Sequence, residues 1–146
     1  MTILIDQAFV SKLLNSFLEI DLVHENGMHT DWNGSEYTSK IGVYSPDPRE
    51  GYAEIKHFPA GKKPFSTTSD EAVGLFQVIL KYPTDIGTFA IKDKAEEILS
   101  VLKIGSTLSF GNQNVEIVSN ARDGGRIDGS YYQIVVRANY RAFTPR

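Results

Sequence analysis

Hydrophobic residues recur with a helical period near the start of the chain. Apolar side chains at positions 9, 10, 13, 14, 17 and 18 share one helix face, and polar Lys12 and Glu19 fall on the opposite side. Asp6 stands just before this pattern, where an N-cap residue belongs. We therefore expect an amphipathic helix that starts after Asp6 and packs on the domain's own sheet.

The next part of the chain has weaker patterns. Residues 21–39 are polar and rich in turn residues, so we expect a variable loop region. Extended segments are expected at 40–44 and 51–58, separated by a link whose two prolines exclude a helix. Neither alternating set in 51–58 is cleanly apolar, which is typical of an edge strand or a β-arm that contacts a neighbour. Residues 59–73 are expected to form a flexible loop within the domain.

The second half of the chain has clearer patterns. Residues 75–82 are apolar on both faces, as in a central strand covered on both sides. A second amphipathic helix is expected at 88–102, followed by a hairpin at 107–121 and an Asp/Gly-rich turn at 123–129. The final strand, 131–142, alternates an apolar face with a mixed polar one. Its apolar face should pack on helices, and its polar face should meet solvent or a partner.

These elements predict an α+β fold in a single domain over residues 1–146. The sheet is expected to be mixed and mainly antiparallel, packed by two α-helices, with the chain order α-β-β-β-α-β-β-β. A chain of 146 residues has the size of one ordinary domain. It buries enough surface to fold without a metal or a disulfide.

Composition narrows the classes of function. The chain has no cysteine, which excludes disulfides, thiolate zinc sites and cysteine nucleophiles. Its N-terminus lacks the basic region of a signal peptide. No apolar run approaches the ~18 residues of a membrane span. We expect a protein made in a cytoplasm, with no membrane contact.

Charge is distributed unevenly. Residues 1–73 hold 11 acidic and 6 basic side chains, a net charge of −5, and residues 74–146 hold 7 acidic and 9 basic ones, a net charge of +2. The chain lacks the dense basic stripe with which proteins neutralise phosphates, so nucleic-acid binding is not expected. Opposite charge on two faces would suit head-to-tail association of copies. Scattered solvated charge is the simpler alternative.

One cluster has the residue types of a metal site: Asp21, His24, Glu25, His29 and Asp31. Its spacing matches no helical zinc motif, and an Asn-Gly turn signal separates the two histidines. We interpret it as a solvated acidic loop. The chain also lacks a Gly-x-Ser-x-Gly elbow and any nucleophile paired with a histidine. No catalytic residue, metal site or cofactor is therefore expected.

Two groups of residues are candidates for contacts with other molecules. The first consists of aromatic side chains in the irregular acidic half of the chain, because aromatic residues are enriched at interface cores. The second lies in the turn 122–129, which is most simply a link between two strands and alternatively a ligand site. The candidate interface residues are Trp32, Tyr37, Tyr44, Tyr52, Arg122, Asp123, Arg126 and Asp128.

Several short segments, in one order, resemble a known family. They are Phe-Pro-Ala at 58–60, Gly-Leu-Phe-Gln-Val at 74–78, Gly87, Gly105 with the hairpin segments 108–111 and 115–117, and the run 131–140. In this order the chain resembles the tail terminator proteins of long-tailed bacteriophages. The resemblance covers most of the chain, and the polar segment 21–39 departs from it.

The resemblance implies a virion structural protein without a cofactor or active site. It implies a homo-oligomer, a hexameric ring at the head-proximal end of the tail that caps the tube and stops further polymerisation. The implied partners are the major tail-tube protein and a head-connector or stopper protein, and DNA passes through the ring without sequence-specific binding. One alternative is another phage neck or head–tail joining protein. An alternative from a different class is a small-ligand-binding or enzymatic α/β domain that uses the turn 122–129.

Overall fold

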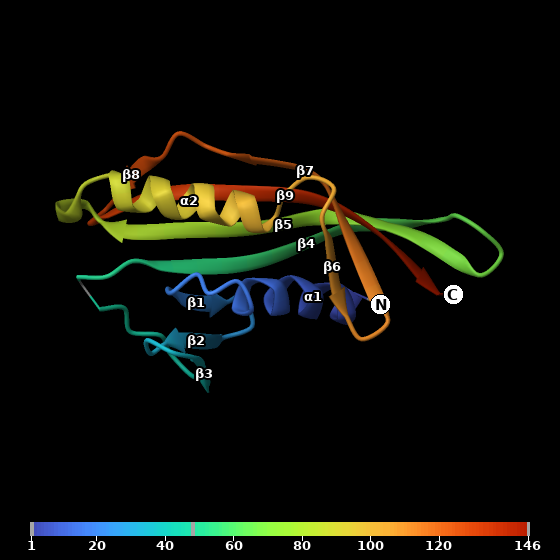
Figure 1. Ribbon diagram of the computed structural model, residues 1–146, viewed down its shortest axis with the longest axis horizontal. Helices are drawn as coiled ribbons and strands as arrows, with labels where there is room; N and C mark the ends of the chain where they lie inside the picture. Colours follow the sequence, from blue (N-terminus) through green and yellow to red (C-terminus); the bar gives the residue numbers. More distant parts are fainter. Residues whose placement is uncertain (1, 48, 146) are drawn as a thin grey trace.

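A long, twisted, nine-stranded sheet carries two helices (Figure 1). The computed structural model describes residues 2–47 and 49–145. The two α-helices are α1 (Thr2–Leu14) and α2 (Phe89–Val101), and a short 3-10 helix, η1 (Thr84–Ile86), precedes α2. The strands are β1 (Asp21–His24), β2 (Met28–Trp32), β3 (Tyr37–Ile41), β4 (Tyr52–Pro64), β5 (Ser69–Pro83), β6 (Thr107–Phe110), β7 (Gln113–Arg122), β8 (Arg126–Asp128) and β9 (Tyr131–Pro145).

The strands follow the spatial order β3-β2-β1-β4-β5-β9-β7-β6, and β8 pairs with β9 outside this path. Every pairing is antiparallel except that of β1 with β4, which is parallel. The α+β class, the mainly antiparallel sheet and the order of the predicted elements are confirmed. The central position predicted for residues 75–82 is also confirmed, because β5 lies between β4 and β9.

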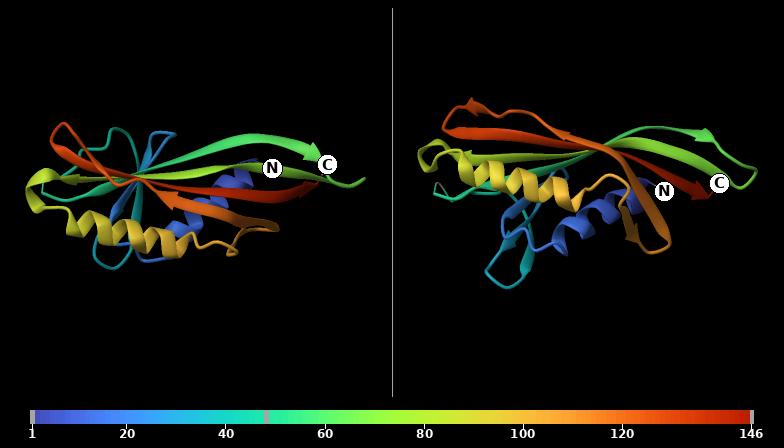
Figure 2. Two further views of the ribbon diagram at one scale, coloured as in Figure 1. Left: turned by 90° about the horizontal axis from the view of Figure 1, so that it is seen from above. Right: turned by 45° about the horizontal axis from the view of Figure 1, so that its top comes forward.

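Both helices lie on the same face of the sheet (Figure 2). Even-numbered residues of β5 and β9 point into the core beneath them, because side chains alternate along a strand. At its centre Phe76 stacks between Phe9 of α1 and Tyr140 of β9, with ring centroids 4.2 and 4.5 Å away. The opposite, odd-numbered side, here called the open face, is covered by neither α1 nor α2. Helices therefore cover β5 on one side only, although Ile79 and Val135 on the open face are also buried, so the expectation that β5 is covered on both sides holds only in part.

Helix α1 differs from its predicted limits at both ends. It begins at Thr2, so Asp6 lies inside the helix rather than at its N-cap. Ile5 is buried and extends the apolar spacing back from Phe9, a signal present in the sequence. The helix ends at Leu14 because Phe17, with φ 52°, takes the left-handed conformation that stops helices.

The polar segment 21–39 is not a loop region, because it contains β1, β2 and most of β3. A hairpin joins β1 to β2, and Gly27 occupies its turn with φ 87°. Leu22 and Thr30 face each other across this hairpin and are buried. Leu22 is the one buried residue of β1, and the two buried residues of β2, His29 and Thr30, are polar. Burial in these four- and five-residue strands therefore does not follow an alternation of apolar and polar residues that the sequence could show.

The predicted flexible loop at 59–73 is mostly paired strand. Strand β4 continues to Pro64 and β5 starts at Ser69, so only residues 65–68 connect them. Together with the end of β9 they form a projection, here called the arm, which extends beyond the helices (Figure 1). A β-bulge between Pro59 and Gly61 bends the chain where the arm leaves the body of the domain. The first residues of α1 and the last residues of β9 lie near each other at this end (Figures 1 and 2).

Candidate assembly surface

The four predicted aromatic residues pack within the chain, at the end of the sheet remote from the arm. Trp32 and Tyr37 contact each other, with ring centroids 4.9 Å apart. Tyr44 and Tyr52 form a second pair at 5.2 Å, and Tyr131 meets Tyr52 edge-on at 5.8 Å. Tyr52 is buried and the other three predicted residues are half-buried. Their packing inside one copy is established, and their role in an interface stays a prediction.

Asp21 organises this aromatic group. Its carboxylate accepts hydrogen bonds from the backbone N–H of Trp32 at 2.9 Å and from the Tyr44 hydroxyl at 2.8 Å. Burial, followed by the nearby Asp21 charge, raises the pKa of Tyr44, so its hydroxyl stays protonated and donates. Asp21 therefore ties the segment after β3 to the start of β1.

The other members of the suspected metal cluster also have structural partners. His24 Nε2 lies 3.1 Å from the Thr30 hydroxyl, and Asp31 pairs with Lys40 at 2.5 Å. The interpretation as a solvated acidic loop was wrong, because these residues belong mainly to β1 and β2. Within residues 2–47 and 49–145, no three His, Asp or Glu side chains are arranged to hold a metal ion.

The four predicted residues of the turn 122–129 divide into two kinds. Arg122 pairs with Glu96 of α2 at 2.7 Å, and Asp123 accepts backbone N–H groups of Gly125 and Val135. These two residues hold β7, α2 and β9 together. Arg126 and Asp128 are exposed on the three-residue strand β8, a strand that the turn prediction missed. They are the members of this group that remain accessible.

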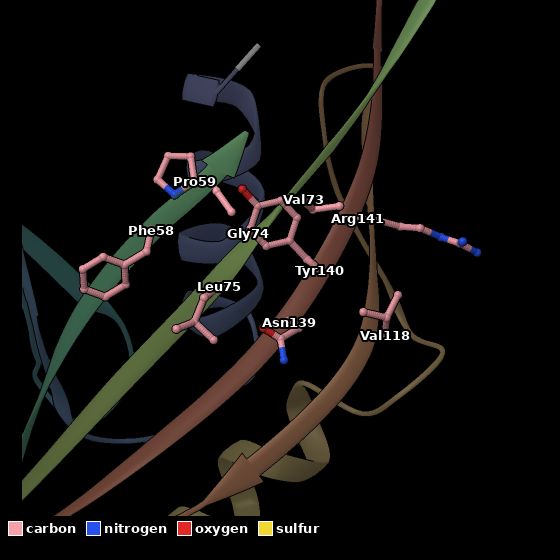
Figure 3. A pocket seen from close by; sticks show the side chains of 10 residues that line it. Phe58, Pro59, Val73, Gly74, Leu75, Val118, Asn139, Tyr140 and Arg141 are labelled. Carbon is pink, nitrogen blue, oxygen red and sulfur yellow. The ribbon is translucent and has the colours of Figure 1, made fainter. Parts of the chain in front are cut away.

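The open face contains a groove that the sequence analysis did not identify (Figure 3). It has a volume of about 550 Å³ and lies where the arm joins the body of the sheet. Its apolar lining includes Phe58 of β4, Val73 and Leu75 of β5, and Val118 of β7. Phe58, Val73 and Val118 are each about two-fifths exposed, at 45%, 40% and 42%. Apolar side chains of this size on a sheet face without a helix indicate a contact surface.

Three of the segments that carry the family resemblance meet at this groove. Segment 58–60, the start of segment 74–78 and the end of segment 131–140 all line it. Gly74 allows the close approach, because a Cβ there would lie 2.5 Å from the Tyr140 hydroxyl and 2.7 Å from the carbonyl oxygen of Phe58. The sequence showed these segments separately, and only strand register brings them together.

Beneath the groove, His57 and Tyr140 form a buried polar pair. His57 Nε2 lies 2.6 Å from the Tyr140 hydroxyl, and His57 Nδ1 lies 3.7 Å from a carboxylate oxygen of Asp6. Burial lowers the pKa of His57, with Asp6 and Glu25 partly opposing the shift. Burial also raises the pKa of Tyr140 to about 12, so the hydroxyl donates to a neutral imidazole. This pair satisfies two polar groups inside the core.

In the part of the chain that the structure describes, no helix is long and apolar enough to cross a membrane.

Comparisons with known proteins agree with this fold and also identify the family of the chain. Five chains of solved structures match, and one of them covers 100% of this chain and 99% of its own length with a TM-score of 0.72. Its sequence identity is 16%, so this likeness shows the fold alone. A search of curated proteins gave no significant match. The family model described as phage tail terminator protein matches residues 5–140. Since that match spans nearly the whole sequence, the chain belongs to the phage tail terminator protein family.

Proposed function

We propose that this protein caps the completed phage tail tube as a six-membered ring. The ring stops the addition of tail-tube protein and presents the surface to which the head is joined. The observation that carries this proposal is the family match over residues 5–140. The family consists of structural proteins of the phage tail, which contact other tail and head components.

The architecture suits a structural subunit that assembles with other proteins and catalyses no reaction. One helix-covered face holds the core, so the open face and the arm are available for contacts with other subunits. A ring of identical copies needs two different surfaces on each copy, because its contacts are head-to-tail. We propose no catalytic step, no metal and no cofactor. Phage DNA passes through the ring without sequence-specific contacts.

The proposed partners are further copies of this chain, the major tail-tube protein and a head-connector or stopper protein. The exposed strand β8, with Arg126 and Asp128, is our candidate for a contact with one of these other proteins. The half-buried Trp32, Tyr37 and Tyr44 border the same end of the domain and are candidates for the rim of that contact.

Tube polymerisation tests the proposal directly. Tail-tube protein is allowed to polymerise with increasing amounts of this protein, and tube lengths are measured by electron microscopy. We expect shorter tubes with a ring at one end, and light scattering of the free protein over a concentration range gives its mass. Tubes of unchanged length without end-bound density would contradict the capping function, whatever the mass in solution.

A further inference from the structure

The apolar lining of the groove continues along the open face of the arm. Beyond Val73, strand pairing places Phe143 on the same face, where its ring lies 4.5 Å from that of Phe65. Phe143 is 42% exposed and Phe65 is 64% exposed. These residues and the groove form one surface, here called the arm patch: Phe58, Phe65, Val73, Leu75, Val118 and Phe143.

Charged groups beside the arm patch are already paired within the same copy. Arg141 meets Glu116 at 3.2 Å across β9 and β7. Lys63 meets Glu71 at 3.3 Å across the arm hairpin. A partner that covers the patch therefore does not have to supply counter-charges for these side chains, whose burial alone would be costly. The patch is suited to an apolar partner surface.

A second apolar surface lies at the free edge of the sheet. Ile41 at the end of β3 and Val43 just after it are 89% and 94% exposed. Strand β3 stands at one end of the strand order, opposite to β6, and among the described strands it pairs with β2 alone. The nearest charge, Lys40, is neutralised by Asp31. This edge segment, residues 40–43, lies away from the arm, at the opposite side of the molecule (Figure 1).

We propose that the edge segment of one copy packs into the arm patch of the next, with Ile41 and Val43 covering Phe58, Val73 and Val118. This inference rests on the proposed function, since a ring requires such a contact between two different surfaces of each copy. Both surfaces are apolar, both have their neighbouring charges paired, and they lie apart on the monomer. Contact between them therefore joins different copies and leaves each copy with one surface free for the next.

Single charge substitutions test the contact. We expect Val73→Asp in the arm patch and Val43→Asp in the edge segment each to convert rings into monomers by light scattering. Ile104→Asp is the matched control, because Ile104 is 57% exposed and lies outside both surfaces. It should keep the rings, and thermal unfolding of all three variants checks that the fold is retained. Rings that persist in both V73D and V43D would overturn the inference.

Mixing the two variants gives a sharper test. The V43D copy keeps an intact arm patch, and the V73D copy keeps an intact edge segment. An equimolar mixture should therefore form a dimer with one copy of each variant and no larger species. A mixture that remains monomeric would contradict the pairing of these two surfaces.

If the protein forms rings only on a tail tube, cross-linking can still identify the contact between copies. The chain has no cysteine, so V43C and V73C can be introduced together without competing thiols. We expect disulfide-linked multimers under oxidising conditions, in free rings or on capped tubes, and none from I104C with V73C. Tubes that are capped normally without cross-links would overturn this inference and leave the proposed function standing. Failure to cap tubes at all would instead count against the proposed function.

Discussion

At the scale of single residues, Gly74 permits the close packing beneath the groove. Its missing side chain leaves room for the Tyr140 hydroxyl and for the carbonyl oxygen of Phe58. We expect Gly74→Ala to lower the free energy of unfolding by about 1–3 kcal/mol through overpacking. Gly124→Ala is the control, because a Cβ there meets nothing within 4 Å and should change stability by less than about 0.5 kcal/mol. Denaturant unfolding measures both, and equal stabilities would contradict this account.

The buried His57 and the half-buried His24 should make stability depend on pH. Desolvation lowers the pKa of His57 and of His24 from their ordinary value of 6.5, with Asp6 partly opposing both shifts. The unfolded chain therefore binds more protons than the folded one just below pH 6.5, so the free energy of unfolding falls as the pH drops through this range. Well above pH 6.5 both imidazoles are neutral in the folded and the unfolded chain, so this loss of stability is absent.

His57→Gln should flatten that pH dependence without removing it, because His24 contributes with the same sign. The glutamine amide retains a partner for the Tyr140 hydroxyl. Melting temperatures measured between pH 5 and pH 8 give the slope for wild type and variant. An identical slope in H57Q would show that His57 is not the group responsible.

At the scale of elements, the ion pair between Glu96 of α2 and Arg122 of β7 distinguishes Arg122 from Arg126, the other predicted interface arginine. Arg122→Glu replaces an ion pair with two carboxylates side by side and should lower the free energy of unfolding by about 1 kcal/mol. Arg126 is exposed, so Arg126→Glu should leave stability almost unchanged. Combining R122E with Glu96→Arg should recover the loss. If β8 contacts another tail protein, R126E impairs tail docking while unfolding stays unchanged. Normal docking by folded R126E would remove Arg126 from the interface.

The elements that the sequence predicted well are those with repeated apolar positions. Residues 75–82, 88–102 and 131–142 each hold three or more core side chains at regular spacing. The sequence therefore predicts whether each segment is a helix or a strand, and in which order they come. Strands β1 and β2 hold only one or two buried residues each, and their stability depends on pairing with β4 and β3. The arm was mistaken for a loop because its residues from Phe58 to Pro64 are exposed, and backbone pairing with β5 leaves no apolar signature.

The candidate surfaces were harder to predict for a geometric reason. Aromatic residues in irregular sequence suggested Trp32, Tyr37, Tyr44 and Tyr52, but the rings of these residues contact one another within the copy, and the Tyr44 hydroxyl donates to Asp21. The arm patch combines residues from β4, β5, β7, β9 and the connection 65–68 that lie up to 85 positions apart, from Phe58 to Phe143. Only the register of the sheet reveals that they are neighbours. Sequence patterns describe one face of one element and do not show which elements are adjacent.

At the scale of the whole molecule, the start of α1 and the end of β9 lie together beside the arm (Figure 2). An affinity tag or a fluorescent protein fused after β9 would therefore sit next to Phe143 of the arm patch, whereas one fused before α1 would lie on the helix-covered side of the same end. A fusion after β9 would hinder the binding of a neighbour there, and a tagged preparation would behave as a monomer for reasons unrelated to its biology. Tags should be cleaved before any mass is measured. A label for imaging belongs outside both the arm patch and the edge segment, for example at the exposed Ile104.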